Sequence, residues 1–79
     1  MTDADPPELR TLSPAAKRAY DTLREADDDL SRFELQQRTR HAQSTTIEAL
    51  GDLRDAGLVE RRNTWPVPLY GLTESATHD

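Results

Sequence analysis

The chain has 79 residues, no cysteine and a formal net charge of -5. A chain of this size forms one small domain whose core is only marginally sufficient, so we expect a homodimer. The lack of cysteine and the wide separation of His41 and His78 exclude disulfides, thiolate chemistry and a histidine metal pair, so we expect no cofactor and no enzyme activity. No apolar run reaches the ~18 residues of a membrane span and the N-terminus is acidic, so we expect a soluble, cytoplasmic protein without a membrane partner.

Residues 1–12 are rich in Asp, Pro and Thr and are predicted to be a flexible acidic segment. The first helix is predicted to begin at Ser13 and Pro14, because a capping hydroxyl precedes a residue whose fixed φ suits the first helical position. Alanine, tyrosine and leucine then recur at helical spacing and give the helix one apolar face. Three successive aspartates, residues 27–29, end it, because carboxylates at a helix C-terminus oppose the dipole.

The segment LSRFE, residues 30–34, is the strongest local signal in the chain. Ser31 and Glu34 form a capping box, and Leu30 and Leu35 occupy the positions of a hydrophobic staple. A second helix of about two turns is therefore predicted from Arg32 to Thr39. A short third strand near Leu30, beside the two strands of the hairpin, is an optional part of the predicted fold.

A turn over residues 40–42 leads to a third predicted helix that extends to about Ala56. The residues expected to face its core recur at positions i, i+3, i+4 and i+7: Thr46, Ala49, Leu50 and Leu53. Gly57 is expected in the left-handed conformation that closes a helix, with Leu58 making the accompanying apolar contact.

Two strands of a hairpin are predicted over residues 58–62 and about 67–72. Pro66 and Pro68 confine the chain between them to a tip, because proline cannot donate a ladder hydrogen bond. We expect Trp65 to pack over Tyr70, with an exposed anchor for a partner as the alternative. The predicted core comprises Ala16, Tyr20, Leu23, Leu30, Leu35, Leu50, Leu53, Leu58 and Leu72.

The charges are distributed unevenly along the chain. Residues 1–29 carry a balance of -4, residues 30–62 carry +1 and residues 63–79 carry -2. The middle segment is therefore the only one that is not acidic. The bases are nine Arg and one Lys against fifteen carboxylates, which resembles the composition of proteins from extreme halophiles, especially haloarchaea.

The arrangement from Ser13 to Thr73 resembles the winged helix-turn-helix domains of MarR-type and ArsR-type transcriptional regulators, particularly short archaeal ones. The matching segments are the second helix, the third helix with Ser44 and Thr45, the run AGLVERR at residues 56–62 and YGLT at residues 70–73. Members usually carry Gly where this chain has Arg40. The resemblance implies a mainly α fold, three helices with a small β-hairpin wing, over residues 13–73, followed by a flexible tail at residues 74–79.

The resemblance also implies a sequence-specific regulator that binds double-stranded DNA with its third helix in the major groove and its wing on the backbone. Gln43 could pair with adenine, Ser44 and Thr45 could reach phosphate or a base edge, Ile47 could touch a thymine methyl, and Glu48 could accept from cytosine. The candidate phosphate contacts and the DNA-facing histidine are Arg32, Arg38, Arg40, His41, Arg54, Arg61 and Arg62. Arg61 and Arg62 should point to opposite faces of their strand, so only one is expected on DNA.

A protein-interaction module without DNA binding is the alternative function. The third helix lacks Lys and Arg from Gln43 to Leu53 and carries Glu48 and Asp52. An acidic helix of this kind, with Ile47 and Trp65 exposed, would suit such a module. A positive or neutral strip that joins Arg32, Arg40, the third helix and Arg61 would favour DNA. A continuous acidic surface there would favour a protein partner.

Overall fold

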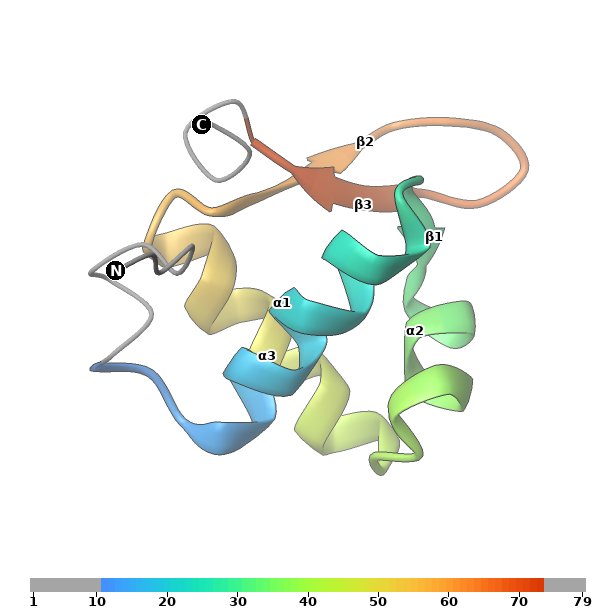
Figure 1. Cartoon of the computed structure of the whole chain (residues 1–79). Coiled ribbons are helices and arrows are strands. Elements are labelled where there is room, and N and C mark those ends of the chain that lie inside the picture. The colour runs from blue at the N-terminus through green and yellow to red at the C-terminus, as the bar shows by residue number, and fades with distance from the viewer. Residues whose placement is uncertain (1–10, 74–79) are drawn as a thin grey trace.

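The computed structural model describes residues 11–73, and within them three helices pack beneath a small antiparallel sheet (Figure 1). The predicted flexible segments at residues 1–10 and 74–79 lie outside the described residues. The elements, in chain order, are α1 (Pro14–Ala26), β1 (Leu30–Ser31), α2 (Arg32–Thr39), α3 (Gln43–Asp55), β2 (Val59–Arg62) and β3 (Leu69–Leu72). This is the predicted winged helix-turn-helix, and we call residues 59–72 the wing.

The helix starts follow from local capping. The Ser13 hydroxyl accepts a hydrogen bond from the Ala16 amide at 3.2 Å, and Pro14 is the first residue of α1. At α2 the predicted capping box is present: the Glu34 amide donates to Ser31 Oγ at 3.1 Å, and the Ser31 amide donates to Glu34 Oε1 at 3.0 Å. These bonds satisfy amides that a helix leaves without intrahelical acceptors.

The end of α3 also has the predicted geometry, one residue earlier than expected. Ala56 is the C-cap rather than part of the helix, and Gly57 has a φ of 78°. The Leu58 amide donates to the Leu53 carbonyl at 2.9 Å, and the Gly57 amide donates to the Arg54 carbonyl at 3.0 Å. A left-handed glycine permits this paired closure, which turns the chain from α3 into the wing.

The sheet has the strand order β1-β3-β2, with both pairs antiparallel. The possible strand near Leu30 is confirmed, because Leu30 pairs with Tyr70 and thereby ties the start of α2 to the wing. Both predicted hairpin strands are shorter than expected, beginning at Val59 and Leu69. Pro66 and Pro68 explain the late start of β3, since neither can donate a hydrogen bond to a neighbouring strand.

The core lies between the three helices and the inner face of the sheet. Eight of the nine predicted core residues are buried, and Ala19, Ala49, Val59 and Thr46 are buried with them. Leu72 is the exception: it is only partly buried and packs at the edge of the cluster. Leu12, which precedes α1, also packs against the core.

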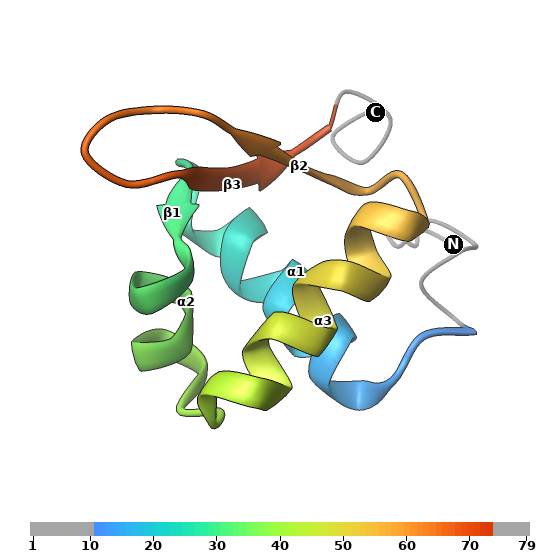
Figure 2. The ribbon, with the colours of Figure 1, turned by 180° about the vertical axis from the view of Figure 1, so that it is seen from behind.

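The expectation that Trp65 packs over Tyr70 is wrong. The Trp65 side chain is 91% exposed at the tip of the wing. The loop that carries it extends beyond the sheet (Figure 2), and none of the residues 11–73 covers the indole with an apolar surface.

Candidate nucleic-acid interface

Helix α3 presents an uncharged start, residues 43–47, to solvent. Thr46, Ala49, Leu50 and Leu53 are buried against the core, so the opposite side of the helix faces outward. Gln43, Ser44 and Ile47 are exposed there, Ile47 to 49%, while Thr45 is half-buried. These residues offer amide, hydroxyl and methyl groups in one turn and a half of helix, the groups that read base edges in a major groove.

The first turn of α3 has free hydrogen-bonding capacity in its backbone. Ala42 is the N-cap and makes no side-chain capping bond. The first amides of a helix have no intrahelical acceptor, so those of residues 43–45 are donors at the positive end of the helix dipole. A phosphate oxygen is a suitable acceptor for such donors.

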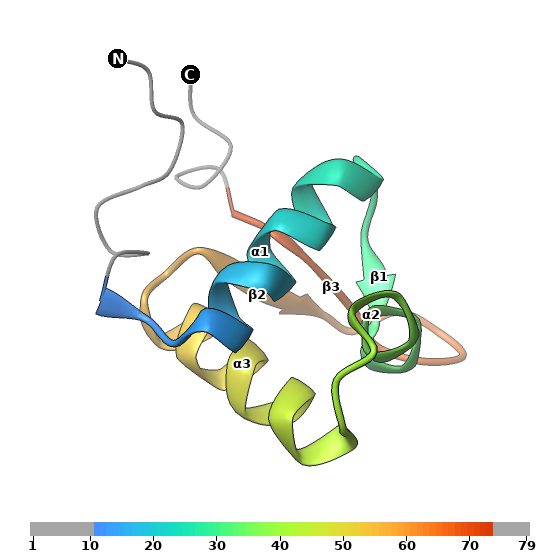
Figure 3. The ribbon, with the colours of Figure 1, turned by 60° about the horizontal axis from the view of Figure 1, so that its bottom comes forward.

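A short turn joins the end of α2 to the start of α3 (Figure 3). Hydrogen bonds to α2 fix this turn and thereby the direction of α3. Thr39 is buried, and its hydroxyl donates to the Leu35 carbonyl at 3.0 Å and accepts from the His41 amide at 3.3 Å. Arg40 has a φ of 64°, a left-handed conformation that glycine adopts at lower cost, and its amide donates to the Gln36 carbonyl at 2.8 Å. His41 is half-buried, and its Nδ1 atom has no hydrogen-bond partner among the described residues.

The candidate arginines do not form one cluster. Arg54 and Arg61 line the same hollow between α3 and β2. Arg38 instead lines a depression beside α1, and Arg32 is half-buried, with Nη1 donating to Gln36 Oε1 at 3.2 Å. Arg40 is exposed at the turn before α3. The positive charge is therefore spread over α2, the turn before α3, the last turn of α3 and the wing strand β2.

Arg62 differs from its neighbour Arg61, as the alternation of a strand requires. Its Nη1 atom lies 2.8 Å from Asp29 Oδ1, and its Nη2 atom lies 2.6 Å from Glu60 Oε2. Arg61 is exposed, whereas Arg62 is half-buried over the sheet. The guanidinium of Arg62 therefore joins the wing to the segment between α1 and β1.

Gly71 gives this ion pair its space. A Cβ built on the buried Gly71 would overlap both the Arg62 guanidinium and the Asp29 carboxylate. The sequence did not indicate Asp29 or Gly71 as partners of Arg62, because Asp29 is 33 residues away along the chain. The only local signal was the alternation that separates Arg61 from Arg62.

Exposed apolar side chains lie outside α3 as well. Phe33 on α2 is 60% exposed and Val67 in the wing loop is 47% exposed, in addition to Trp65. The wing loop is fixed by a hydrogen bond from the Thr64 hydroxyl to the Val67 carbonyl at 2.5 Å. A structured loop with an uncovered indole can make an apolar contact that does not depend on charge.

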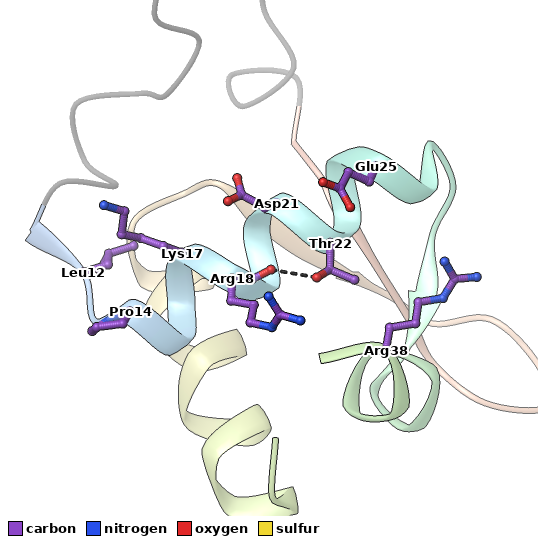
Figure 4. A pocket seen from close by; sticks show the side chains of 8 residues that line it. All are labelled: Leu12, Pro14, Lys17, Arg18, Asp21, Thr22, Glu25 and Arg38. Carbon is purple, nitrogen blue, oxygen red and sulfur yellow. Dashed lines mark hydrogen bonds between the residues drawn. The ribbon is translucent and has the colours of Figure 1, made fainter. Parts of the chain in front are cut away.

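A larger depression beside α1 shows no convergence of reactive groups (Figure 4). It has a volume of about 650 Å³, and the charged side chains around it point in different directions. The Arg18 Nε atom donates to the Thr39 carbonyl at 3.4 Å, and the Thr22 hydroxyl donates to the Arg18 carbonyl at 2.8 Å. The residues that line it are Leu12, Pro14, Lys17, Arg18, Asp21, Thr22, Glu25 and Arg38.

Within residues 11–73, no three His, Asp or Glu side chains are grouped so that they could hold a metal ion. No helix in the same part of the chain is long and apolar enough to cross a membrane.

Comparison with known proteins shows similarity to transcriptional regulators of solved structure. No protein-family model and no curated protein matches the sequence. The transcriptional repressor BigR from Xylella fastidiosa is 37% identical over 85% of this chain and 65% of its own, with a TM-score of 0.73. A MarR-family transcriptional regulator from Silicibacter pomeroyi is 32% identical over 87% of this chain and 51% of its own, with a TM-score of 0.71.

Lactococcus lactis ZitR, in a structure in complex with DNA, has a TM-score of 0.65 at 17% identity over 85% of this chain and 48% of its own. At this identity the likeness concerns the fold alone. The chain thus spans about half to two thirds of the length of the regulators it matches. Its neighbours are winged-helix transcriptional regulators, one of which is assigned to the MarR family.

Proposed function

We propose that the chain is a DNA-binding transcriptional regulator that reads the major groove with α3 and contacts the backbone with the wing. The observation that carries the proposal is the 37% identity to a transcriptional repressor over 85% of this chain. The exposed, uncharged start of α3 supports it from the geometry. The ZitR complex adds that a protein of this fold binds DNA.

We assign base recognition to the exposed first half of α3. The Gln43 amide suits adenine, which presents an acceptor and a donor side by side, and the Ile47 side chain suits a thymine methyl. Ser44 and Thr45, beside the free backbone amides, suit a phosphate or a base edge. Glu48 would disfavour a phosphate nearby and suits a cytosine amino group.

We assign backbone contacts to the arginines and to His41. Arg40 supports this assignment, because an arginine in a left-handed conformation is costly and functional sites are where such strain persists. Further positive charge comes from Arg32, Arg38, Arg54 and Arg61. His41 lies in the turn just before α3. Arg62, expected from the sequence to contact phosphate, is here assigned to holding the wing, because two carboxylates already satisfy it.

We further propose a homodimer that acts in the cytoplasm, where its DNA is. A dimer would place two α3 helices in successive major grooves, about 34–36 Å apart. The acidic, lysine-poor composition suits work at high salt, of the haloarchaeal kind, because in molar salt the Debye length is about 3 Å and acidic self-repulsion is screened.

A protein-interaction module is the second candidate. The 91% exposure of Trp65 favours it, since exposed aromatic residues anchor protein interfaces. The carboxylates of Glu48, Asp52 and Asp55 on α3 would also suit a basic partner.

Titration of a bound duplex against potassium chloride tests the DNA-binding proposal. With two to four phosphate contacts per subunit, log affinity should fall with log salt at a slope of only about -2 to -4 per subunit. Arg61→Ala should weaken all sequences alike and flatten the slope by about 1, because phosphates carry no sequence information. Gln43→Ala and Ile47→Ala should instead change the preferred sequence.

Ser31→Ala is the matched control, since Ser31 caps α2 and has no assigned DNA contact. Loss of DNA binding by a folded Ser31→Ala protein would contradict the assignment of the interface to α3 and the wing. Identical sequence preference in wild type, Gln43→Ala and Ile47→Ala would contradict the assignment of base recognition.

A further inference from the structure

A hollow of about 500 Å³ lies where α3 meets the first strand of the wing. The hollow is lined by the C-terminal half of α3 and by β2: Gly51, Arg54, Asp55, Val59, Glu60 and Arg61. Helix α3 and the wing diverge from the turn at residues 56–58, and the start of α3 and the wing loop both extend toward the same side of the molecule (Figures 2 and 3). The hollow therefore lies at the closed end of the angle between them.

Gly51 leaves space for this hollow and lowers the stability of the helix. Glycine is the least favourable residue in a helix interior after proline. A Cβ built on Gly51 would meet no atom within 4 Å, and Gly51 does not have the positive φ found at Gly57. Nothing among the described residues therefore requires glycine here, and what the missing side chain preserves is space outside the helix.

The charges around the hollow favour an anion by a small margin. The charged side chains that line the hollow are Arg54 and Arg61 and the carboxylates of Asp55 and Glu60. Glu60 is already paired with Arg62 at 2.6 Å, whereas Arg54 and Arg61 are exposed. Asp55 ends α3, where a negative charge opposes the helix dipole. Two residues unfavourable to the helix, Gly51 and Asp55, thus line the same hollow, and departures from local preference are expected at functional sites.

We propose that this hollow receives one sugar-phosphate strand of the bound duplex, an inference that rests on the DNA-binding function proposed above. A backbone strand separates each major groove from the next minor groove. A duplex with α3 in the major groove and the wing beside the adjacent minor groove must therefore place one strand between them. Gly51 leaves room for that strand, Arg54 and Arg61 neutralise its phosphates, and Asp55 limits the attraction so that non-specific binding stays weak.

Filling the hollow is the first test, with a duplex bound by the wild-type protein as the probe. Gly51→Leu should keep or raise the melting temperature, because leucine is a good helix former, and should lower affinity about 10-fold or more, the effect of losing one charge-assisted contact. The loss of affinity should be equal for all DNA sequences, because a contact with phosphate does not discriminate bases. Gln37→Leu adds the same side chain at an exposed position of α2 and should leave affinity unchanged.

If the Gly51→Leu protein fails to fold, the smaller substitution Gly51→Ala tests the same proposal. Alanine in place of a helical glycine should raise the melting temperature by about 4–8 °C. The same variant should bind DNA less tightly than wild type, so stability and affinity should change in opposite directions.

Changing the charge is the second test. Arg54→Ala with Arg61→Ala should flatten the slope of log affinity against log salt by about 2. Asp55→Asn should tighten binding several-fold at low salt and match wild type in molar salt, where the Debye length is about 3 Å. Asn preserves the size of the side chain, so the comparison isolates its charge.

The two proposals fail in different ways. A wild-type protein that binds no duplex overturns the DNA-binding function and this inference with it. If the wild-type protein binds DNA and the Gly51→Ala and Gly51→Leu proteins bind it with the same affinity as wild type, only the proposal that the hollow receives the backbone strand is overturned. Looser binding by Asp55→Asn at low salt would likewise show that the strand runs elsewhere.

Discussion

Replacing each of the adjacent arginines of β2 separates stability from DNA binding. Arg62 bridges Asp29 at 2.8 Å and Glu60 at 2.6 Å, with the Arg62 and Asp29 side chains 37% and 33% exposed. An exposed ion pair contributes about 0.2–1 kcal/mol, and a charge-assisted hydrogen bond up to about 3 kcal/mol. Because this pair is half-buried, we expect Arg62→Ala to lower the free energy of unfolding by about 1–2 kcal/mol.

A double-mutant cycle measures the part of this effect that belongs to the ion pair. Denaturant unfolding of wild type, Asp29→Ala, Arg62→Ala and the double variant should give a coupling of about 1 kcal/mol between the two residues. Gly71→Ala should remove most of this coupling, because its Cβ would occupy the position of both charged groups. In a domain of this size, 1 kcal/mol corresponds to about 4–8 °C in melting temperature.

Arg61→Ala is the matched control, since Arg61 is exposed on the other face of the same strand. It should change stability by no more than about 0.5 kcal/mol and should weaken DNA binding. A coupling near zero between Asp29 and Arg62, or a larger stability loss for Arg61→Ala than for Arg62→Ala, would refute the assignment of Arg62 to holding the wing.

Three further substitutions test the fold and the turn. Leu53→Ala should lower the free energy of unfolding by about 2–5 kcal/mol, because the side chain is fully buried, and an unchanged denaturation midpoint would contradict the packing of α3. Ser31→Ala should lower the free energy of unfolding by about 1 kcal/mol, because it removes the hydroxyl oxygen that accepts the Glu34 amide hydrogen bond of the capping box, and thermal unfolding measures this loss. Arg40→Gly should hold or raise the melting temperature by relieving a left-handed arginine, while weakening DNA binding; a large loss of stability would show that the Arg40 side chain supports the fold.

The parts of the fold that the sequence predicted well depend on residues close together in the chain. The capping box of Ser31 and Glu34 lies within four consecutive residues, and the closure of α3 by Gly57 involves only residues 53–58. Such signals are complete within one window of sequence. The apolar spacing of α3 similarly identified its buried face, because helical geometry fixes which side chains share a side.

The parts that the sequence did not predict depend on distant residues or on the absence of a partner. The link from Arg62 to Asp29 crosses 33 positions and requires the space that Gly71 leaves. Trp65 was expected to be covered because an indole usually finds apolar contacts, but the loop that holds it extends beyond the sheet. The hollow at Gly51 was not predicted either, because its two walls come from α3 and β2.

For the candidate interface, the sequence predicted which side chains of α3 are exposed but not how the arginines are arranged. Exposure of Gln43, Ser44 and Ile47 follows from the buried face of the same helix. The positions of the arginines do not follow from such a pattern, because long side chains on different elements share a surface only through the tertiary fold. Arg38 accordingly lines a depression beside α1, whereas Arg54 and Arg61 share the hollow beside the wing.

Selection from a pool of random DNA duplexes in molar potassium chloride tests the proposed function most directly. Non-specific phosphate attraction is weak under these conditions, so recovery of a duplex requires contacts with base edges. We predict an enriched motif with two half-sites about one helical turn apart, whose sequence changes in Gln43→Ala or Ile47→Ala proteins. Recovery of no enriched motif by the folded wild-type protein, at molar salt and again at ~0.2 M salt, would contradict the proposal that this chain reads DNA.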